Sequence, residues 1–218
     1  MRKSLPLIFL SLVMPAAVFV IFRLAPLNDT LGESSRLLYI HVPLAVCAVV
    51  SFLVSGYNAV RYLMTRNNLF SISSHAATRL GFLFVILTTI TGAVWAKIAW
   101  GLWWNWDPRE SSILFLLLVY SAYFALHSSL GERADSKRLC ASYLIFAAAV
   151  MPFFVFIMPR LNPSLHPDTI INSERTIHLT IGMRLSLLLS TVAFMTLFYV
   201  LYSREIGIAR RSGRGKGE

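Results

Sequence analysis

Six runs of apolar residues divide the chain, and each has roughly the 20 residues that an α-helix needs to cross a bilayer. The predicted spans are Leu5–Phe22, Leu38–Leu63, Leu80–Ile98, Ser111–Leu130, Leu139–Met158 and Leu179–Tyr202. The hydrophobic share of 56% against 14% charged residues agrees with this, and the short connectors leave no space for a soluble domain. We therefore predict an all-α integral membrane protein with a single six-helix domain over residues 1–208.

The positive charges favour one orientation of these helices. The chain has 20 Lys and Arg against 10 Asp and Glu, a net charge of +10. With connectors on alternate sides, thirteen basic and only four acidic residues fall on the side of the N-terminus. Because cytoplasmic loops collect Lys and Arg, both termini are predicted to be cytoplasmic, and the charge does not indicate nucleic-acid binding. A basic tail over 209–218 is predicted to be disordered. A cleaved signal peptide is the alternative for the first run.

All five tryptophans lie in one connector on the predicted outer side, between the third and fourth spans. The segment reads W-A-K-I-A-W-G-L-W-W-N-W-D-P-R-E, and its rings belong to Trp95, Trp100, Trp103, Trp104 and Trp106. Tryptophan is common where a bilayer meets water, but an aromatic belt covers both interfaces, and the other side has none. The segment at about 95–112 therefore favours a flat platform for a large planar ligand, with a simple belt as the alternative.

Three of the five histidines share this outer side. They are His41 at the start of the second span, His166 in the connector after the fifth, and His178 at the start of the sixth. A planar ligand between histidines from distant parts of a chain suggests haem b, whose iron takes axial imidazoles from both faces. His41 is the first predicted ligand. The residues alone leave the second open between His166 and His178, with His166 slightly favoured.

Haem carries two propionates, which pair well with arginine. The predicted propionate or partner contacts are Arg36, within about two helical turns of the first ligand, and Arg109, which closes the tryptophan segment. Further candidates on this side are Arg160, Arg175 and Arg184. Asp107, in W-D-P, is predicted to cap the fourth helix and to belong to the haem platform together with the five tryptophans. In an alternative interpretation, Asp107 and Glu110 present charge to a protein partner.

The segment W-A-K-I-A-W-G-L-W-W-N-W-D-P-R-E-S resembles the WWD signature of the haem-handling proteins of bacterial cytochrome c maturation. With six spans, Arg36 ahead of Y-I-H-V-P, and S-L-H in the fifth connector, the chain is most similar to the haem exporter protein C (CcmC) family. The resemblance implies His41 and His166 as axial ligands of non-covalent haem b at the periplasmic face of the bacterial inner membrane. It also implies delivery of haem to the chaperone CcmE, beside the transporter subunits CcmA and CcmB and the single-span protein CcmD.

Other interpretations stay open at this point. After the tryptophans the family usually reads W-D-A-R-L-T, whereas D-P-R-E-S is nearer the D-P-K-E-T of the related synthase subunit CcsA. A bis-histidine electron-transfer cytochrome is another alternative, although its ligands normally lie within helices. A transporter is disfavoured because the sequence shows no internal repeat and no acid within a span. No ATP-binding loop or nucleophile with a base indicates an enzyme, so we predict a haem-transfer factor.

Overall fold

The structure is a computed structural model that describes residues 5–27, 32–130, 134–161, 163–166 and 179–214. Its long helices are α1 (Leu5–Phe19), α2 (Leu38–Thr65), α3 (Asn68–Trp100), α4 (Pro108–Leu130), α5 (Ala134–Pro152) and α6 (Ile181–Arg214). Together with the turns that flank them, these six helices are long and apolar enough to cross a membrane. The described residues contain no strand, so the predicted all-α fold with six spans is confirmed.

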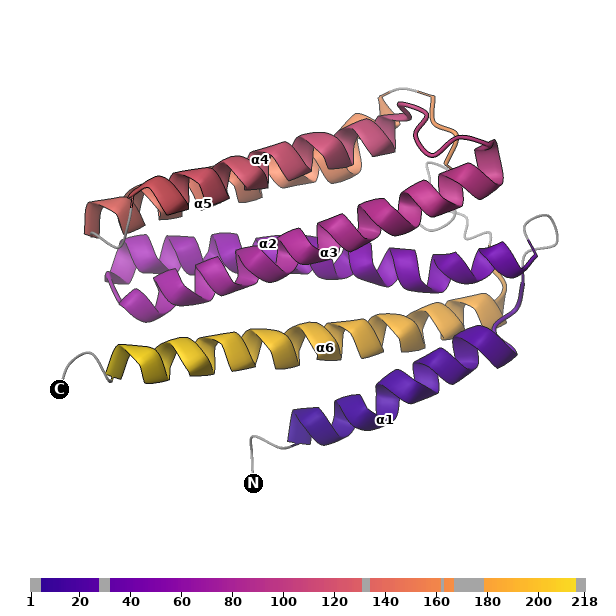
Figure 1. The fold of residues 1–218 in the computed structure, drawn as a ribbon, viewed down its shortest axis with the longest axis horizontal. Coiled ribbons are helices and arrows are strands. Elements are labelled where there is room, and N and C mark those ends of the chain that lie inside the picture. The colour runs from indigo at the N-terminus through magenta and orange to yellow at the C-terminus, as the bar shows by residue number, and fades with distance from the viewer. Residues whose placement is uncertain (1–4, 28–31, 131–133, 162, 167–178, 215–218) are drawn as a thin grey trace.

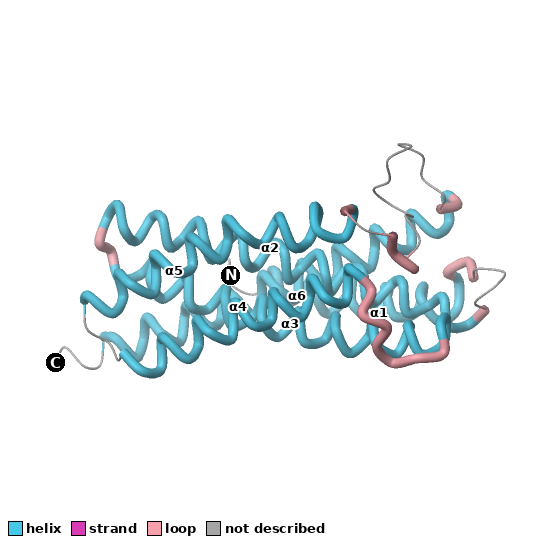
Figure 2. Tube along the Cα trace, turned by 90° about the horizontal axis from the view of Figure 1, so that it is seen from above, coloured by secondary structure: helices cyan, strands magenta, loops and turns pink. Residues whose placement is uncertain are grey.

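The helices pack as three pairs that lie one above another (Figure 1). α4 and α5 form one outer layer, α2 and α3 the middle layer, and α1 and α6 the other outer layer. α2 is central, since it contacts α3, α5 and α6. Figures 1 and 2 show the described parts of the connectors after α1, α3 and α5 at one end of the bundle, opposite the α2–α3 turn. The fold thus gathers the predicted site residues that the structure describes at one end.

The start of α3 differs from the prediction. The sequence predicts a span from Leu80, but the helix begins at Asn68. The polar stretch before Leu80 is helical because its hydroxyls face α2: Oγ1 of Thr78 lies 2.6 Å from Oγ of Ser55, and the Ser74 hydroxyl donates to the Ser55 carbonyl at 2.8 Å. Polar side chains that pair between helices satisfy each other inside a bilayer. Their polarity therefore marks a helix interface and not a loop.

The fifth span changes its helical geometry near its outer end, where the sequence predicts a regular helix. A π-helical turn at Phe153–Ile157 and a 3₁₀ turn at Met158–Arg160 follow α5. Pro159 has no N–H, and its ring crowds the carbonyl four residues earlier, so regular α-helical hydrogen bonding cannot continue there. π turns are frequent at functional sites, and this one lines the cavity described below.

The last helix is longer than predicted. The sixth span is expected to end at Tyr202, with disorder over 209–218, but α6 continues to Arg214. A helix that has already formed extends by one hydrogen bond for each residue it fixes, so the first residues of the tail follow the span. Residues 215–218 lie outside the described residues.

Gly56 sets the distance between α2 and α5. A Cβ built on Gly56 would lie 2.5 Å from Cβ of Ala148, closer than two such carbons can approach. Gly56→Ala is expected to lower the free energy of unfolding by about 1–3 kcal/mol, the usual cost of overpacking. Thermal denaturation in detergent, followed by circular dichroism, measures the loss. Gly207→Ala is the control, because nothing lies within 4 Å of its Cβ position. An equal loss in both variants would contradict the packing explanation.

Candidate functional site

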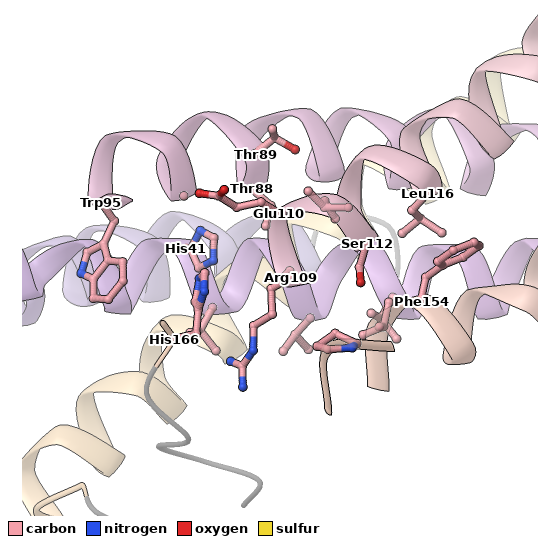
Figure 3. A pocket seen from close by; sticks show the side chains of 18 of the residues that line it. His41, Thr88, Thr89, Trp95, Arg109, Glu110, Ser112, Leu116, Phe154 and His166 are labelled. Carbon is pink, nitrogen blue, oxygen red and sulfur yellow. The ribbon is translucent and has the colours of Figure 1, made fainter. Parts of the chain in front are cut away.

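A cavity of about 470 Å³ lies between α2, α3, α4 and the π turn at Phe153–Ile157. Its volume falls within the roughly 300–1,000 Å³ that is typical of small-molecule sites. Most of its lining is apolar and includes Val42 and Leu116. Among the polar and charged side chains that line it are both predicted axial ligands, His41 and His166, which Figure 3 shows together. The fold thus brings two histidines from distant parts of the chain to one site.

His41 lies in the first turn of α2, where the sequence places it. Its Nδ1 is 3.0 Å from Oγ1 of Thr91. The Thr91 hydroxyl directs its one hydrogen to the carbonyl of Leu87, at 2.9 Å, or of Thr88, at 3.1 Å, so it accepts from the His41 Nδ1–H. The lone pair of the ring is then on Nε2, a form in which imidazole binds metals. Gly92 gives the ring its space, since a Cβ there would lie 3.0 Å from His41 Cε1.

His166 is held by the buried carboxylate of Asp107. Its Nδ1 lies 3.2 Å from Oδ1 of Asp107. Oδ2 of the same carboxylate accepts from the Ser164 hydroxyl at 2.9 Å and from the Leu165 N–H at 2.7 Å. The Arg109 N–H donates to the same carboxylate at 2.9 Å, so Asp107 caps α4 as predicted. One buried side chain therefore joins the tryptophan connector to the segment that carries His166. With Nδ1–H donated to the carboxylate, the lone pair of this ring is also on Nε2.

Burial and charge set the protonation of this pair. Burial lowers the pKa of His166 below its usual value. The negative charge of Asp107 acts in the opposite direction and raises this pKa, whereas the positive charge of Arg109 lowers it further. Burial alone would raise the pKa of Asp107, but the hydrogen bonds from Arg109, Leu165 and Ser164 and the nearby His166 bring that pKa below its ordinary value. At neutral pH the pair is a neutral imidazole beside a carboxylate, which is the state that a metal ligand requires.

Three of the five tryptophans lie at the site, and the indole pairs that pack together are not coplanar, while a platform for a planar ligand stays a prediction. Trp95 and Trp104 line the cavity. Trp95 and Trp100 also contact the ring of His166, with centroid distances of 5.8 and 4.8 Å. The rings of Trp95 and Trp100 are inclined at 84°, and those of Trp104 and Trp106 at 89°. Indole pairs favour such edge-to-face packing over coplanar rings, because ring edges and faces carry opposite partial charges.

Two of the tryptophans face outward instead. Trp103 is 58% exposed and Trp106 is 72% exposed, and neither lines the cavity among the described residues. Trp106 has a left-handed φ of 57°, which is unusual for a bulky residue and turns the chain into the start of α4. The tryptophan segment therefore has an inner part at the cavity and an outer part at the surface.

The arginines that line the cavity are not the same pair that the sequence predicts as propionate contacts. Arg109, from α4, and Arg160, from the 3₁₀ turn after α5, line the cavity. Arg36 does not belong to the described lining, so its predicted contact with a propionate is not supported. Its guanidinium lies 2.5 Å from the carboxylate of Glu33 and donates to the carbonyl of Ile21. A cation placed in a long-range bond of this kind cannot be recognised from sequence spacing.

The remaining outer candidates lie elsewhere. Arg184 donates its Nε–H to the carbonyl of Leu179 at 2.9 Å and is not part of the described cavity lining. His178 and Arg175 lie outside the described residues. His166 is therefore the histidine that the structure places beside His41, while the position of its competitor stays open.

Glu110 has a role that the sequence analysis missed. Its Oε2 accepts the backbone N–H groups of Asn105, at 2.7 Å, and Asp107, at 3.3 Å. Together with the Asp107 cap this forms a capping box. In this motif the side chain of the N-cap residue accepts a backbone N–H of the first helical turn, and the acid three positions later accepts the backbone N–H of the N-cap residue. The order D-P-R-E carries that signal. Asp107 and Glu110 are 4% and 8% exposed, so the interpretation that they present charge to a partner is wrong.

Comparison with known proteins gives one family. The family described as "Heme exporter protein C" matches residues 2–215. The protein of that name from Haemophilus influenzae is 29% identical over 192 residues, 87% of this chain and 77% of that protein. Its namesake from Rhodobacter capsulatus is 29% identical over 185 residues, 83% and 74% of the two chains. A ccmC-like mitochondrial protein of Marchantia polymorpha is 27% identical over 191 residues, 87% and 81%. Because the family match runs through nearly the whole sequence, the chain belongs to the haem exporter protein C family.

Proposed function

We propose that this protein binds haem b non-covalently between His41 and His166 and delivers it to a periplasmic haem chaperone for cytochrome c maturation. The observation that carries the proposal is that both histidines line one cavity and that each uses Nδ1 for a hydrogen bond. Ligating histidines usually hold their second nitrogen in this way, which orients the ring and fixes its tautomer. The two Nε2 atoms are then the iron ligands. The relatives' names, which refer to heme export and cytochrome c biosynthesis, support this role.

The lining of the cavity suits haem. Its apolar walls, with Trp95 at one side, match the macrocycle, and Arg109 and Arg160 are cations for the two propionates. His41 comes from α2 and His166 from the segment after α5, so two separate elements would hold the iron. Haem, when bound, would supply the iron and the porphyrin edge at which a partner could be attached. The protein's own part would be to hold and orient this cargo.

The proposal places the cavity at the outer face of the bacterial inner membrane, with both termini in the cytoplasm. The charge distribution supports this orientation, since the end opposite the cavity carries most of the Lys and Arg. The exposed rings of Trp103 and Trp106 offer a surface to the chaperone, CcmE. CcmA, CcmB and CcmD complete the assembly in this proposal, and membrane lipid covers the apolar helix faces.

Haem binding by the purified protein tests the proposal. In detergent, with haem added, the wild-type protein is expected to bind one haem with a low-spin b-type spectrum, because two imidazoles give a six-coordinate iron. Acid acetone is expected to extract this haem, since no covalent bond holds it. Circular dichroism confirms that the sample is folded. A folded protein that binds no haem would contradict the proposal and support the aromatic-belt interpretation.

Transfer separates delivery from electron transfer. When the haem-loaded protein is mixed with apo-CcmE in the same detergent, we expect the haem to move to the chaperone, which affinity separation of the two proteins measures. A bis-histidine electron-transfer protein would keep its haem in this mixture, because its function is to change the oxidation state of a haem that stays bound. Retention of the haem, with a chaperone shown to accept haem from solution, would therefore favour that alternative.

A further inference from the structure

Glu110 lines the cavity, and one of its carboxylate oxygens has no hydrogen-bond partner among the described residues. The side chain is 8% exposed and lies in the first turn of α4, where Oε2 serves the capping box. Oε1 is buried and has no hydrogen-bond partner among the described residues. Glu110 and His41 both belong to the lining of the cavity, which Figure 3 shows. One oxygen of Glu110 therefore has backbone partners, and the other has none among the described residues.

A buried carboxylate oxygen without a partner is unfavourable unless a donor or a positive charge meets it. Here the positive end of the α4 dipole and two backbone N–H groups stabilise the negative charge on Glu110. Because Glu110 lines the cavity, this negative charge would act on a ligand held there. The propionates of haem are anions and suit Arg109 and Arg160 instead. The iron centre is the cationic part of haem, since a ferric porphyrin core carries one positive charge and a ferrous core carries none.

We propose that Glu110 supplies a fixed negative charge to the cavity, so that the site binds ferric haem more tightly than ferrous haem. This inference rests on the proposed function and adds a preference between oxidation states to it. The charge acts through space and involves no proton or electron transfer of its own. Coulomb attraction is strong at such a place, because the cavity is largely apolar and screens charge weakly.

The reduction potential of bound haem measures this preference. Glu110→Gln keeps an oxygen for the two backbone donors but removes the charge. We expect the preference for ferric haem to fall about tenfold, which raises the midpoint potential by about 59 mV for a one-electron couple. Spectroelectrochemical titration of the purified, haem-loaded protein follows the change. Asp135→Asn, which removes a carboxylate with 92% side-chain exposure at the start of α5, is the control and should leave the potential unchanged.

Glu110→Asp separates the charge from the cap. It keeps the negative charge but shortens the reach to the backbone donors, so its potential should stay close to that of the wild-type protein. An equal rise in the aspartate and glutamine variants would assign the effect to the cap and overturn the inference. So would an unchanged or lower potential in Glu110→Gln with haem still bound, and in that case the proposed function would stand. A folded wild-type protein that binds no haem would overturn both.

Discussion

His41→Ala and His166→Ala are each expected to abolish the low-spin haem spectrum of the purified protein. Each substitution removes one of the two axial ligands and leaves a five-coordinate, high-spin iron. The loss of haem affinity should exceed the roughly 10–100-fold cost that is typical when only an outer partner of a metal ligand is removed. Haem titration gives the affinity, and reduced and oxidised spectra give the spin state. His127→Ala, in the last turn of α4 at the opposite end of the bundle, is the matched control.

A rescue experiment separates loss of a ligand from loss of the fold. Imidazole added to His166→Gly is expected to restore the low-spin spectrum, because the small ligand fills the space that the side chain leaves. Circular dichroism of each variant should match that of the wild-type protein. The assignment is wrong if His178→Ala abolishes the spectrum while His166→Ala leaves it intact.

Asp107→Ala is expected to weaken haem binding by roughly 10–100-fold, because it removes the carboxylate that orients His166. It should also lower the free energy of unfolding by about 1–3 kcal/mol, since the Ser164 hydroxyl, the Leu165 N–H and the N-terminus of α4 lose their acceptor. Asp107→Asn keeps an acceptor oxygen without the charge, and we expect it to lose less of both. Haem titration and thermal denaturation measure the two effects separately.

The control for Asp107→Ala is a helix cap at the other end of the bundle. Asn67 caps α3 through a hydrogen bond from the Leu69 N–H, at 3.0 Å, and lies far from the cavity lining. Asn67→Ala should cost about 1 kcal/mol of stability and leave haem affinity unchanged. If the two alanine variants weaken haem binding equally, general destabilisation explains the result, and the proposed role of Asp107 fails.

Local sequence rules predict the parts of this fold that depend on neighbours in the chain. Hydropathy finds the six spans, and α2 begins at the predicted Leu38. The W-D-P order places the cap of α4 at Asp107, because a proline that follows an acid favours the start of a helix. These features rest on residues within a few positions of one another, so they can be found without knowing the fold.

The remaining features depend on contacts between distant segments. Asp107 bonds Ser164 and His166, which lie on another connector, and no spacing in the sequence announces that pairing. The sequence position of Arg36 is compatible both with a contact to a propionate and with a hydrogen bond to the carbonyl of Ile21. The bond to Ile21 forms because of how the first two helices pack. The contacts of Trp95 and Trp100 with the ring of His166 likewise join segments that are distant in the sequence.

The hydroxyl pairs between α2 and α3 bear on how the chain enters the membrane during synthesis. The first third of α3 is too polar to be a favourable span by itself, but Ser74 and Thr78 find their partners on α2 through Ser55. A two-residue turn joins the helices, so these groups can meet as soon as the second helix leaves the ribosome. The two helices can therefore be inserted as one hairpin, with their polar surface covered before it meets lipid.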